Sequence, residues 1–286
     1  MSDNESVCSV ATEIETELDV LLHHMTNEKK SSNTIRSYKQ QYGKLREYLK
    51  KDISTVSQAM IIQSIDKITE NSNSRASLLN IGIVVRKIYE KAVELMEKRR
   101  IELKKNICVD MKVANKELAE HLPPLSEFDN YIDFLYDNGK WQEYVINYLI
   151  RHAYVRNQDL VLQIVRNKKD MSEEGTNYLW IGKNKVVYVR RDYKTFQTYG
   201  EKTNEFKDMK FRNACMKIKG SLIPNPDNPG YYVKHLSFKQ LGEGALMKMI
   251  VNHYRLNGDL HKIKEISKSR GTSLDVLADN YNVQDC

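Results

Sequence analysis

The chain has 286 residues and a net charge of +7, so it is long enough to form two domains with sizeable cores. It contains no apolar run of membrane-spanning length, and its acidic first 25 residues lack the basic-then-apolar pattern of a secretory signal. The four cysteines are far apart and form no Cys-x-x-Cys pair, which argues against a disulfide framework or a zinc site. We therefore expect an intracellular protein that is neither secreted nor embedded in a membrane.

Charge is unevenly distributed along this chain. Residues 1–25 contain six carboxylates and no Lys or Arg, so the rest of the chain carries the whole positive excess. A basic body predicts a polyanionic partner, most simply double-stranded DNA. The alternative is that the surplus lysines only keep the protein soluble.

The first part of the chain has the periodicity of helices. Residues 1–25 are predicted to be an acidic segment with one helix over Ala11–His24, and residues 26–115 to be a small all-helical domain with basic faces and a helix over residues 33–50. Two further helices are expected over Thr55–Glu70 and Ser74–Asn106. Basic side chains flank the apolar faces, where they either contact phosphates or are simply solvated. The candidate DNA contacts of this domain are Arg36, Lys39, Lys44, Arg99 and Arg100.

A hydrophilic connection over residues 112–125 ends in Pro-Pro and predicts a domain boundary, with the second domain at residues 116–286. Its apolar helix over residues 144–153 is followed by Arg156 and, three residues later, by Asp159, just before a second apolar run. A guanidinium between two buried runs needs an anionic partner. Either the two residues form an internal pair, or Asp159 orients Arg156 so that its fork binds a phosphate.

Beyond residue 165 the pattern becomes β-rich. Residues 177–181 and 185–190 read as a hairpin around Gly182-Lys-Asn184, and residues 196–207 as a third strand. Helices are expected again around residues 213–219, 241–256, 260–269 and 274–281. The predicted fold is mainly α with a small antiparallel β-sheet, in which the helical domain precedes a mixed α+β domain. Arg190, Arg191 and Arg270 are further candidate DNA contacts.

The order of these parts resembles that of the tyrosine recombinases (phage-type integrases), in particular divergent members from viruses or mobile elements. In that family a helical core-binding domain and a mixed catalytic domain form a clamp on DNA. Five segments carry the resemblance. The opening helix of the first domain is resembled by Thr34-Ile-Arg-Ser-Tyr38, and the start of the second domain by Pro124-Leu-Ser126. The first arginine box is resembled by Arg156-Asn-Gln-Asp-Leu160, the catalytic-lysine position by Tyr193-Lys-Thr195, and the Leu-Gly-His-Ser box by Arg270-Gly-Thr-Ser273. Tyr281 follows Thr272 by nine residues and stands at the position of the nucleophile.

The resemblance implies roles for these residues. Arg156, oriented by Asp159, would neutralise charge on the scissile phosphate, Lys194 would be the general acid, and Tyr281 would form a 3′-phosphotyrosyl link. The second box departs from the family's His-x-x-Arg, because Ala245-Leu-Met-Lys248 supplies only Lys248, a point charge without a fork. Thr272 likewise replaces a histidine. No metal or nucleotide cofactor is implied, and a homo-oligomer on DNA follows from the family alone.

Each candidate also has a plainer interpretation. Tyr281 would serve packing, Lys194 would be a simple phosphate contact, and Lys248 would be a solvated side chain. At the level of function, the leading hypothesis is a DNA-cleaving and rejoining recombinase with an altered active site. The alternatives are a catalytically inactive DNA-binding protein of the same fold, with an architectural or regulatory role, and a basic helical interaction protein.

Overall fold

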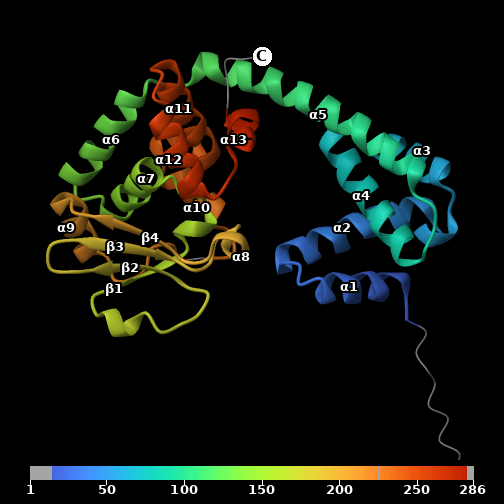
Figure 1. The fold of residues 1–286 in the computed structure, drawn as a ribbon, viewed down its shortest axis with the longest axis horizontal. Coiled ribbons are helices and arrows are strands. Elements are labelled where there is room, and N and C mark those ends of the chain that lie inside the picture. Colours follow the sequence, from blue (N-terminus) through green and yellow to red (C-terminus); the bar gives the residue numbers. More distant parts are fainter. Residues whose placement is uncertain (1–14, 225, 282–286) are drawn as a thin grey trace, which may run out of the picture. The chain divides into compact units, whose positions relative to one another are not determined.

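The structure, a computed structural model, describes residues 15–224 and 226–281. They divide into two compact units between Met111 and Lys112 (Figure 1). Among the helices of the described ranges, none is both long and apolar enough to cross a lipid bilayer.

The first unit is entirely helical. Its elements are α1 (Glu17–Asn27), α2 (Ser32–Leu49), the short 3₁₀ turn η1 (Ile53–Thr55), α3 (Gln58–Ile68), α4 (Ser72–Ile88) and the first part of α5 (Glu94–His121). The side chains of Ser31, Ser57 and Asn71 accept hydrogen bonds from backbone amides of the first turns and so fix where α2, α3 and α4 begin. The fully buried apolar side chains of these helices meet in one core that includes Leu21, Leu45, Ile61, Leu79 and Val85.

Helix α1 belongs to the core of this unit. The sequence predicted an acidic accessory helix over Ala11–His24, of which residues 11–14 lie outside the described part. The Glu17 carboxylate is 7% exposed and accepts hydrogen bonds from the Tyr42 hydroxyl (3.0 Å) and from the backbone amides of Ile53 and Ser54 (both 2.8 Å). It therefore ties α1 to α2 and to η1.

The helix predicted over Ser74–Asn106 is in fact two helices. The chain leaves α4 at Ile88, passes through Glu90 with a positive φ of 52°, and enters α5 at Glu94. The Arg86 side chain stabilises this break by donating to the carbonyl oxygens of Val56 and Ala92. The predicted connection at 112–121 is helical, because strong helix formers continue to His121 and the first proline is Pro123.

The second unit contains the remaining elements: α6 (Leu125–Asp137), α7 (Trp141–Ala153), η2 (Gln158–Leu160), β1 (Leu162–Val165), η3 (Lys168–Asp170), β2 (Asn177–Ile181), β3 (Val186–Arg190), α8 (Phe196–Tyr199), β4 (Lys202–Phe206), α9 (Met209–Lys217), β5 (Gly220–Ser221), α10 (Pro229–Leu236), η4 (Phe238–Gln240), α11 (Gly242–Leu256), α12 (Leu260–Arg270) and α13 (Leu274–Tyr281). Helix α7 is buried on nearly all sides. Its core is shared with α6, α11 and one face of the sheet, over which Figure 1 shows the helices gathered.

The sheet is mixed, which corrects the expectation of a purely antiparallel one. Its strand order is β4-β3-β2-β1-β5, and β1 pairs with β2 in parallel while the other pairs are antiparallel. The connection of residues 166–176 is long enough to return the chain to the end where β1 starts, so β2 runs in the same direction. The predicted hairpin is present as β2 and β3. The predicted third strand begins instead as the short helix α8 and becomes β4 only after Gly200, whose φ is 66°.

We predict that Glu17→Ala destabilises the first unit by about 2–4 kcal/mol, because three donors lose a buried, charged acceptor. Urea unfolding of the full chain measures the change. The control is Glu15→Ala, which removes an exposed carboxylate two residues earlier and should change stability by less than about 0.5 kcal/mol. Equal effects of the two substitutions would show that the Glu17 contacts contribute nothing.

Candidate active site

The end of α7 and the end of α12 hold each other through two arginines. Tyr154 takes a left-handed conformation (φ 55°) and turns the chain out of α7 toward Arg156. Arg156 Nη1 donates to the carbonyl oxygen of Arg270 (2.6 Å), while Arg270 Nη1 donates to the carbonyl oxygens of Tyr154 (3.1 Å) and Val155 (3.3 Å). Each guanidinium thus anchors the backbone next to the other, so segments far apart in sequence are fixed in one register.

Arg270 lies inside the protein. Its side chain is 2% exposed, and its Nη2 lies 2.7 Å from the Glu243 carboxylate at the start of α11. A charge buried to this degree requires such a partner. The sequence predicted Arg270 as a DNA contact, but the structure gives its side chain an internal role that joins α11, α12 and the end of α7.

Asp159 has Arg190 as its ionic partner. The two side chains are 0% and 1% exposed, with 3.5 Å between Asp159 Oδ2 and Arg190 Nη1, and the same carboxylate oxygen accepts the backbone amide of Arg156 (3.1 Å). Arg190 Nη2 donates to Asn204 on β4 (3.0 Å) and to Ser269 on α12 (3.1 Å). Arg190, also predicted as a DNA contact, is therefore a buried residue that links β3 to β4 and α12. Asp159 positions Arg156 by accepting the backbone amide of Arg156.

Lys202, which the sequence did not single out, reaches the same place from the start of β4. Its Nζ donates to the carbonyl oxygens of Lys268 (2.7 Å) and Ser269 (3.3 Å), and it lies 5.1 Å and 4.8 Å from the ring centres of Tyr193 and Tyr199. Burial, together with the positive charges of Arg190 and Arg156, lowers the pKa of Lys202 to about 8. No local motif marks this lysine, which explains why it was missed.

Gly271 allows these groups to approach. It ends α12 with a φ of 58°, and a Cβ atom here would lie 2.5 Å from Thr195 Oγ1 and 2.9 Å from Lys202 Nζ. Only glycine leaves that space empty at this φ. The predicted Thr272 follows directly and is half-buried.

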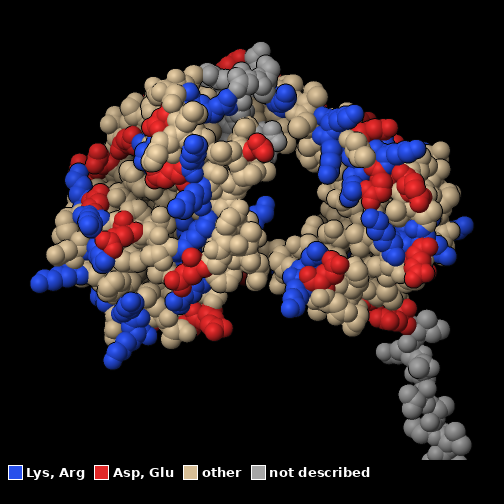
Figure 2. Space-filling model, in the orientation of Figure 1, with Lys and Arg blue, Asp and Glu red and all other residues tan. Residues whose placement is uncertain are grey.

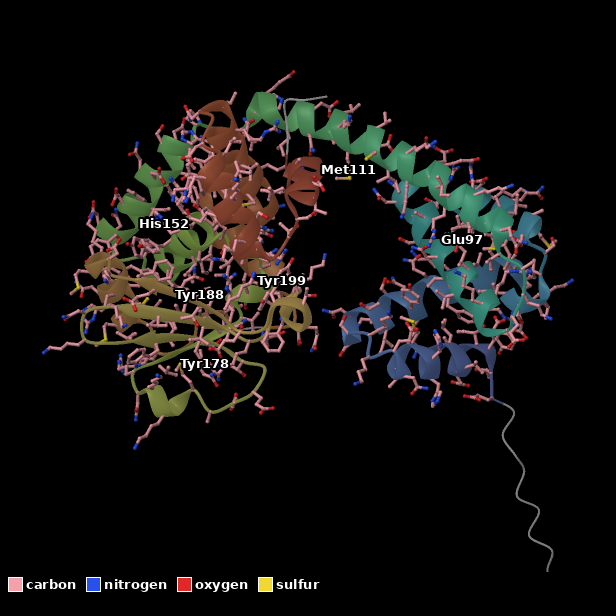
Figure 3. All side chains as sticks on the ribbon, viewed as in Figure 1. Glu97, Met111, His152, Tyr178, Tyr188 and Tyr199 are labelled. Atoms are coloured by element: carbon pink, nitrogen blue, oxygen red, sulfur yellow. The ribbon has the colours of Figure 1, made fainter. Side chains whose placement is uncertain are left out.

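A hollow of about 450 Å³ opens beside this turn. Among the described residues, those that line it include three lysines and no carboxylate; they are Tyr199, Lys202, Lys264, Ser267, Lys268, Gly271, Thr272 and Leu274. Figure 2 shows Lys and Arg side chains gathered in a column over the region of α12 on this unit, and Figure 3 shows Tyr199 near the end of the sheet. The hollow therefore favours a negatively charged ligand.

The remaining catalytic candidates do not all join this cluster. Lys194 is exposed, next to the clustered Tyr193 and Thr195, and makes no hydrogen bond or ion pair within the described structure. Lys248 points to α5, where its Nζ donates to Asn115 Oδ1 (2.5 Å), and burial lowers its pKa. Tyr281 ends α13, but its side chain lies outside the described part. The structure brings together Arg156, Asp159 and Thr272, and leaves Lys248 apart from them.

The candidate DNA contacts of the first unit fall into two groups. Arg36, Lys39 and Lys44 are exposed on α2. Arg99 pairs with Asp66 (3.3 Å) and Glu102 (3.1 Å), and Arg100 pairs with Glu97, so nearby carboxylates already balance these two charges. In the second unit, Arg191 is balanced in the same way by Glu201 (2.7 Å).

The first unit matches a known family. The model of the phage integrase N-terminal SAM-like domain matches residues 18–94, which run from α1 to the start of α5. The first unit is therefore similar to the N-terminal domain of phage integrases over this range. Among solved structures, the chain is similar to one described as the crystal structure of XerA recombinase, with 14% identity, 94% of each chain covered and a TM-score of 0.36. No curated protein matches the sequence.

We predict that Asp159→Asn destabilises the protein by about 3–5 kcal/mol, because it leaves the Arg190 charge buried without its counter-ion. Urea unfolding measures the loss. The control is Glu201→Gln, which breaks the partly exposed pair with Arg191 and should cost no more than about 1 kcal/mol. A loss of similar size in both variants would contradict the role given to the buried pair.

A second prediction concerns the pH dependence of stability. The pKa of Lys202 is about 8 in the folded chain and is expected near its ordinary value of 10.5 in the unfolded chain. Between these values the unfolded chain binds more protons, so folding becomes more favourable as pH rises. The free energy of unfolding of the wild type minus that of Lys202→Met should therefore be constant below about pH 7 and increase from about pH 8 to pH 10. Urea titrations at unit pH steps test this, and a flat difference would contradict it.

Proposed function

We propose that this chain is a DNA-binding recombinase that cleaves and rejoins DNA strands through a 3′-phosphotyrosyl intermediate, and that it acts on DNA inside the cell. The observation that carries the proposal is the group of cations around the turn at Gly271, in the unit that follows the integrase-type domain. Arg156, from the segment after α7, and Lys202, from β4, donate to backbone carbonyls at the end of α12, the helix that carries Lys268. The adjoining hollow is lined by lysines and hydroxyl groups.

In the proposed reaction, Arg156 binds the scissile phosphate. When a phenol oxygen attacks a phosphodiester, negative charge builds on the non-bridging oxygens, and a fixed guanidinium lowers the energy of that state. Arg156 is held by its backbone amide on Asp159 and by the Arg270 carbonyl, so little reorganisation is needed during the reaction. Tyr281, at the end of α13 and nine residues beyond Thr272, would be the nucleophile.

Exposed cations on α2 support a DNA contact by the first unit. Arg36, Lys39 and Lys44 follow one another at spacings of three and five residues, which places them on one side of the helix. The structure shows no ion pair for them within the described residues. They would neutralise DNA phosphates without reading the base sequence.

One observation favours a second candidate function. Lys248, which the sequence placed in the second catalytic box, is bonded to Asn115 on α5, and Arg270 is paired with Glu243. A site without a second phosphate-binding arginine would bind DNA and cleave it poorly. The second candidate is therefore an inactive recombinase-fold protein with an architectural or regulatory role on DNA.

Covalent trapping distinguishes the two functions. We predict that the full chain, incubated with a pool of nicked duplexes of randomised sequence, forms an adduct that survives denaturing electrophoresis. Tyr281→Phe should abolish the adduct, because it removes the attacking oxygen. Arg156→Ala should lower its rate by about 10²–10³-fold.

The matched control is Tyr231→Phe, which removes an exposed hydroxyl on α10 and should leave the adduct unchanged. Salt-sensitive binding to duplex DNA without any adduct would overturn the enzymatic proposal in favour of the second candidate. The absence of salt-sensitive binding would overturn both.

A further inference from the structure

We infer that the second unit binds a second DNA segment at the end of its sheet that lies away from the candidate site. This inference rests on the DNA binding proposed above and adds a separate surface to it. Three features carry it: a row of cations across the strand ends, the scarcity of carboxylates along part of that row, and the direction in which the row faces.

The strand pairings distinguish the two ends of the sheet. Arg190 pairs with Lys202 at the end that carries the candidate site, whereas Val186 pairs with Phe206 at the other end. The turn between β2 and β3 lies at this other end as well, because Ile181 pairs with Val186. Figure 1 shows α8 at one end of the sheet and α9 at the opposite end.

Every strand of the sheet has a cation directly beyond its α9 end. Arg166 follows β1, Lys207 follows β4 and Lys219 precedes β5, while Lys183 and Lys185 occupy the turn between β2 and β3. Neighbouring strands lie about 4.8 Å apart, so the row spans about 19 Å across the sheet. Each strand of duplex DNA has one phosphate per about 3.4 Å of axis, so such a row can face about five or six phosphates.

Carboxylates balance only one side of this row. On the β3–β4 side, Glu205 lies 2.5 Å from the Lys185 ammonium and 4.0 Å from that of Lys207. On the β2–β1–β5 side, the three remaining cations are exposed and form no ion pair within the described ranges. That side of the row therefore keeps its positive charge for a ligand.

Two further lysines enlarge the unbalanced side. Lys168 on η3 places its Nζ 6.0 Å from the ring centre of Trp180, and Lys217 is the last residue of α9. Figure 2 shows Lys and Arg side chains projecting from this side of the second unit. The distal basic edge, as we name this surface, consists of Arg166, Lys168, Lys183, Lys217 and Lys219.

Backbone contacts fix the shape of the distal basic edge. Arg166 Nη2 donates to the carbonyl oxygen of Met216 near the end of α9 (3.0 Å). Arg212 Nε, also on α9, donates to the carbonyl oxygen of Gly182 in the β2–β3 turn (2.9 Å). Helix α9 therefore holds the ends of β1 and β2 together, and the backbone that carries these cations needs little ordering when a ligand binds.

The distal basic edge and the hollow lie at opposite ends of the strands. Five residues of strand span about 17 Å, and duplex DNA is stiff over such a length. A segment bound at the hollow would have to fold back around the sheet to reach the edge. We therefore assign the edge to a separate segment, which it would hold by its phosphates without reading the bases. The linear row matches the line of phosphates along one DNA strand better than the broad charge of a lipid surface.

Lysine protection in the full-length wild type tests this assignment. The chain is treated with an amine-acylating reagent at increasing ratios of a short duplex, and peptide mass spectrometry gives the reaction rate of each lysine. We predict that Lys264 and Lys268, at the hollow, are protected at one duplex per chain. Lys183 and Lys219 should react about tenfold more slowly only when the duplex is in excess, because phosphates then cover them.

The other outcomes separate this inference from the proposed function. If only the hollow lysines are protected at every ratio, the inference fails and the proposed DNA binding stands. If neither group is protected, the proposed function fails as well. Protection of both groups at one duplex per chain would show that the same segment or another protein molecule covers the edge, which overturns the inference. So would protection of the edge by phosphatidylserine vesicles but not by excess duplex.

The salt dependence of binding provides a second test with exposed residues only. Each lysine that contacts a phosphate contributes about 1 to the slope of log K against log salt concentration. Combining Lys183→Gln with Lys219→Gln should therefore lower the slope of the second binding step by about 2 and leave the first step unchanged.

The matched control combines Lys112→Gln with Lys234→Gln, which removes two exposed lysines of the same unit, on α5 and α10. It should leave both binding steps unchanged. A second step that keeps its slope in the edge variant, or that changes equally in the control, would overturn the assignment.

Discussion

The second unit depends on the reciprocal anchoring of Arg156 and Arg270. Each guanidinium donates to a carbonyl oxygen beside the other, so the exit from α7 and the end of α12 cannot move independently. Asp159, Arg190 and Lys202 are each attached to one of these two segments. Asp159 holds the backbone of Arg156, and the carbonyls before Arg270 hold the Lys202 amine. The arrangement of cations follows from backbone contacts as much as from side-chain charge.

Buried carboxylates balance some of these cations and leave others for a ligand. Asp159 and Glu243 pair with Arg190 and Arg270, which are both almost completely buried. These pairs stabilise the architecture, since an unpaired buried guanidinium would be very costly. Lys202 and the exposed Lys264 and Lys268 line a hollow whose described residues include no carboxylate. The positive field of the site therefore arises mainly from lysines at its rim.

The sequence predicted the features that depend on local pattern. The buried helix α7 and the hairpin of β2 and β3 follow from hydrophobic periods and a glycine turn, and both are present. The parallel pairing of β1 with β2 was missed, because strand direction depends on the path of the connection, which has no sequence period. The break between α4 and α5 was also missed. It is fixed by Arg86, whose acceptor on Val56 lies far from it in sequence.

In the candidate site, too, the sequence predicted local contacts but not contacts between segments far apart in the chain. A spacing of three residues suggested a direct relation between Arg156 and Asp159, and their backbone contact is indeed local. The ionic partner of Asp159, however, is Arg190 on β3, and no spacing rule could identify it. Lys202 is recognisable only once β4 lies beside α12, because its burial and its carbonyl partners are created by that packing.

The empty position at Gly271 links backbone shape to acid strength. A single methyl group there would overlap the amine of Lys202 and the hydroxyl oxygen of Thr195, and it would force the amine outward into water. In water the ammonium would recover its hydration shell and hold its proton more tightly. The absence of a Cβ atom at Gly271 thus helps to keep the pKa of Lys202 low.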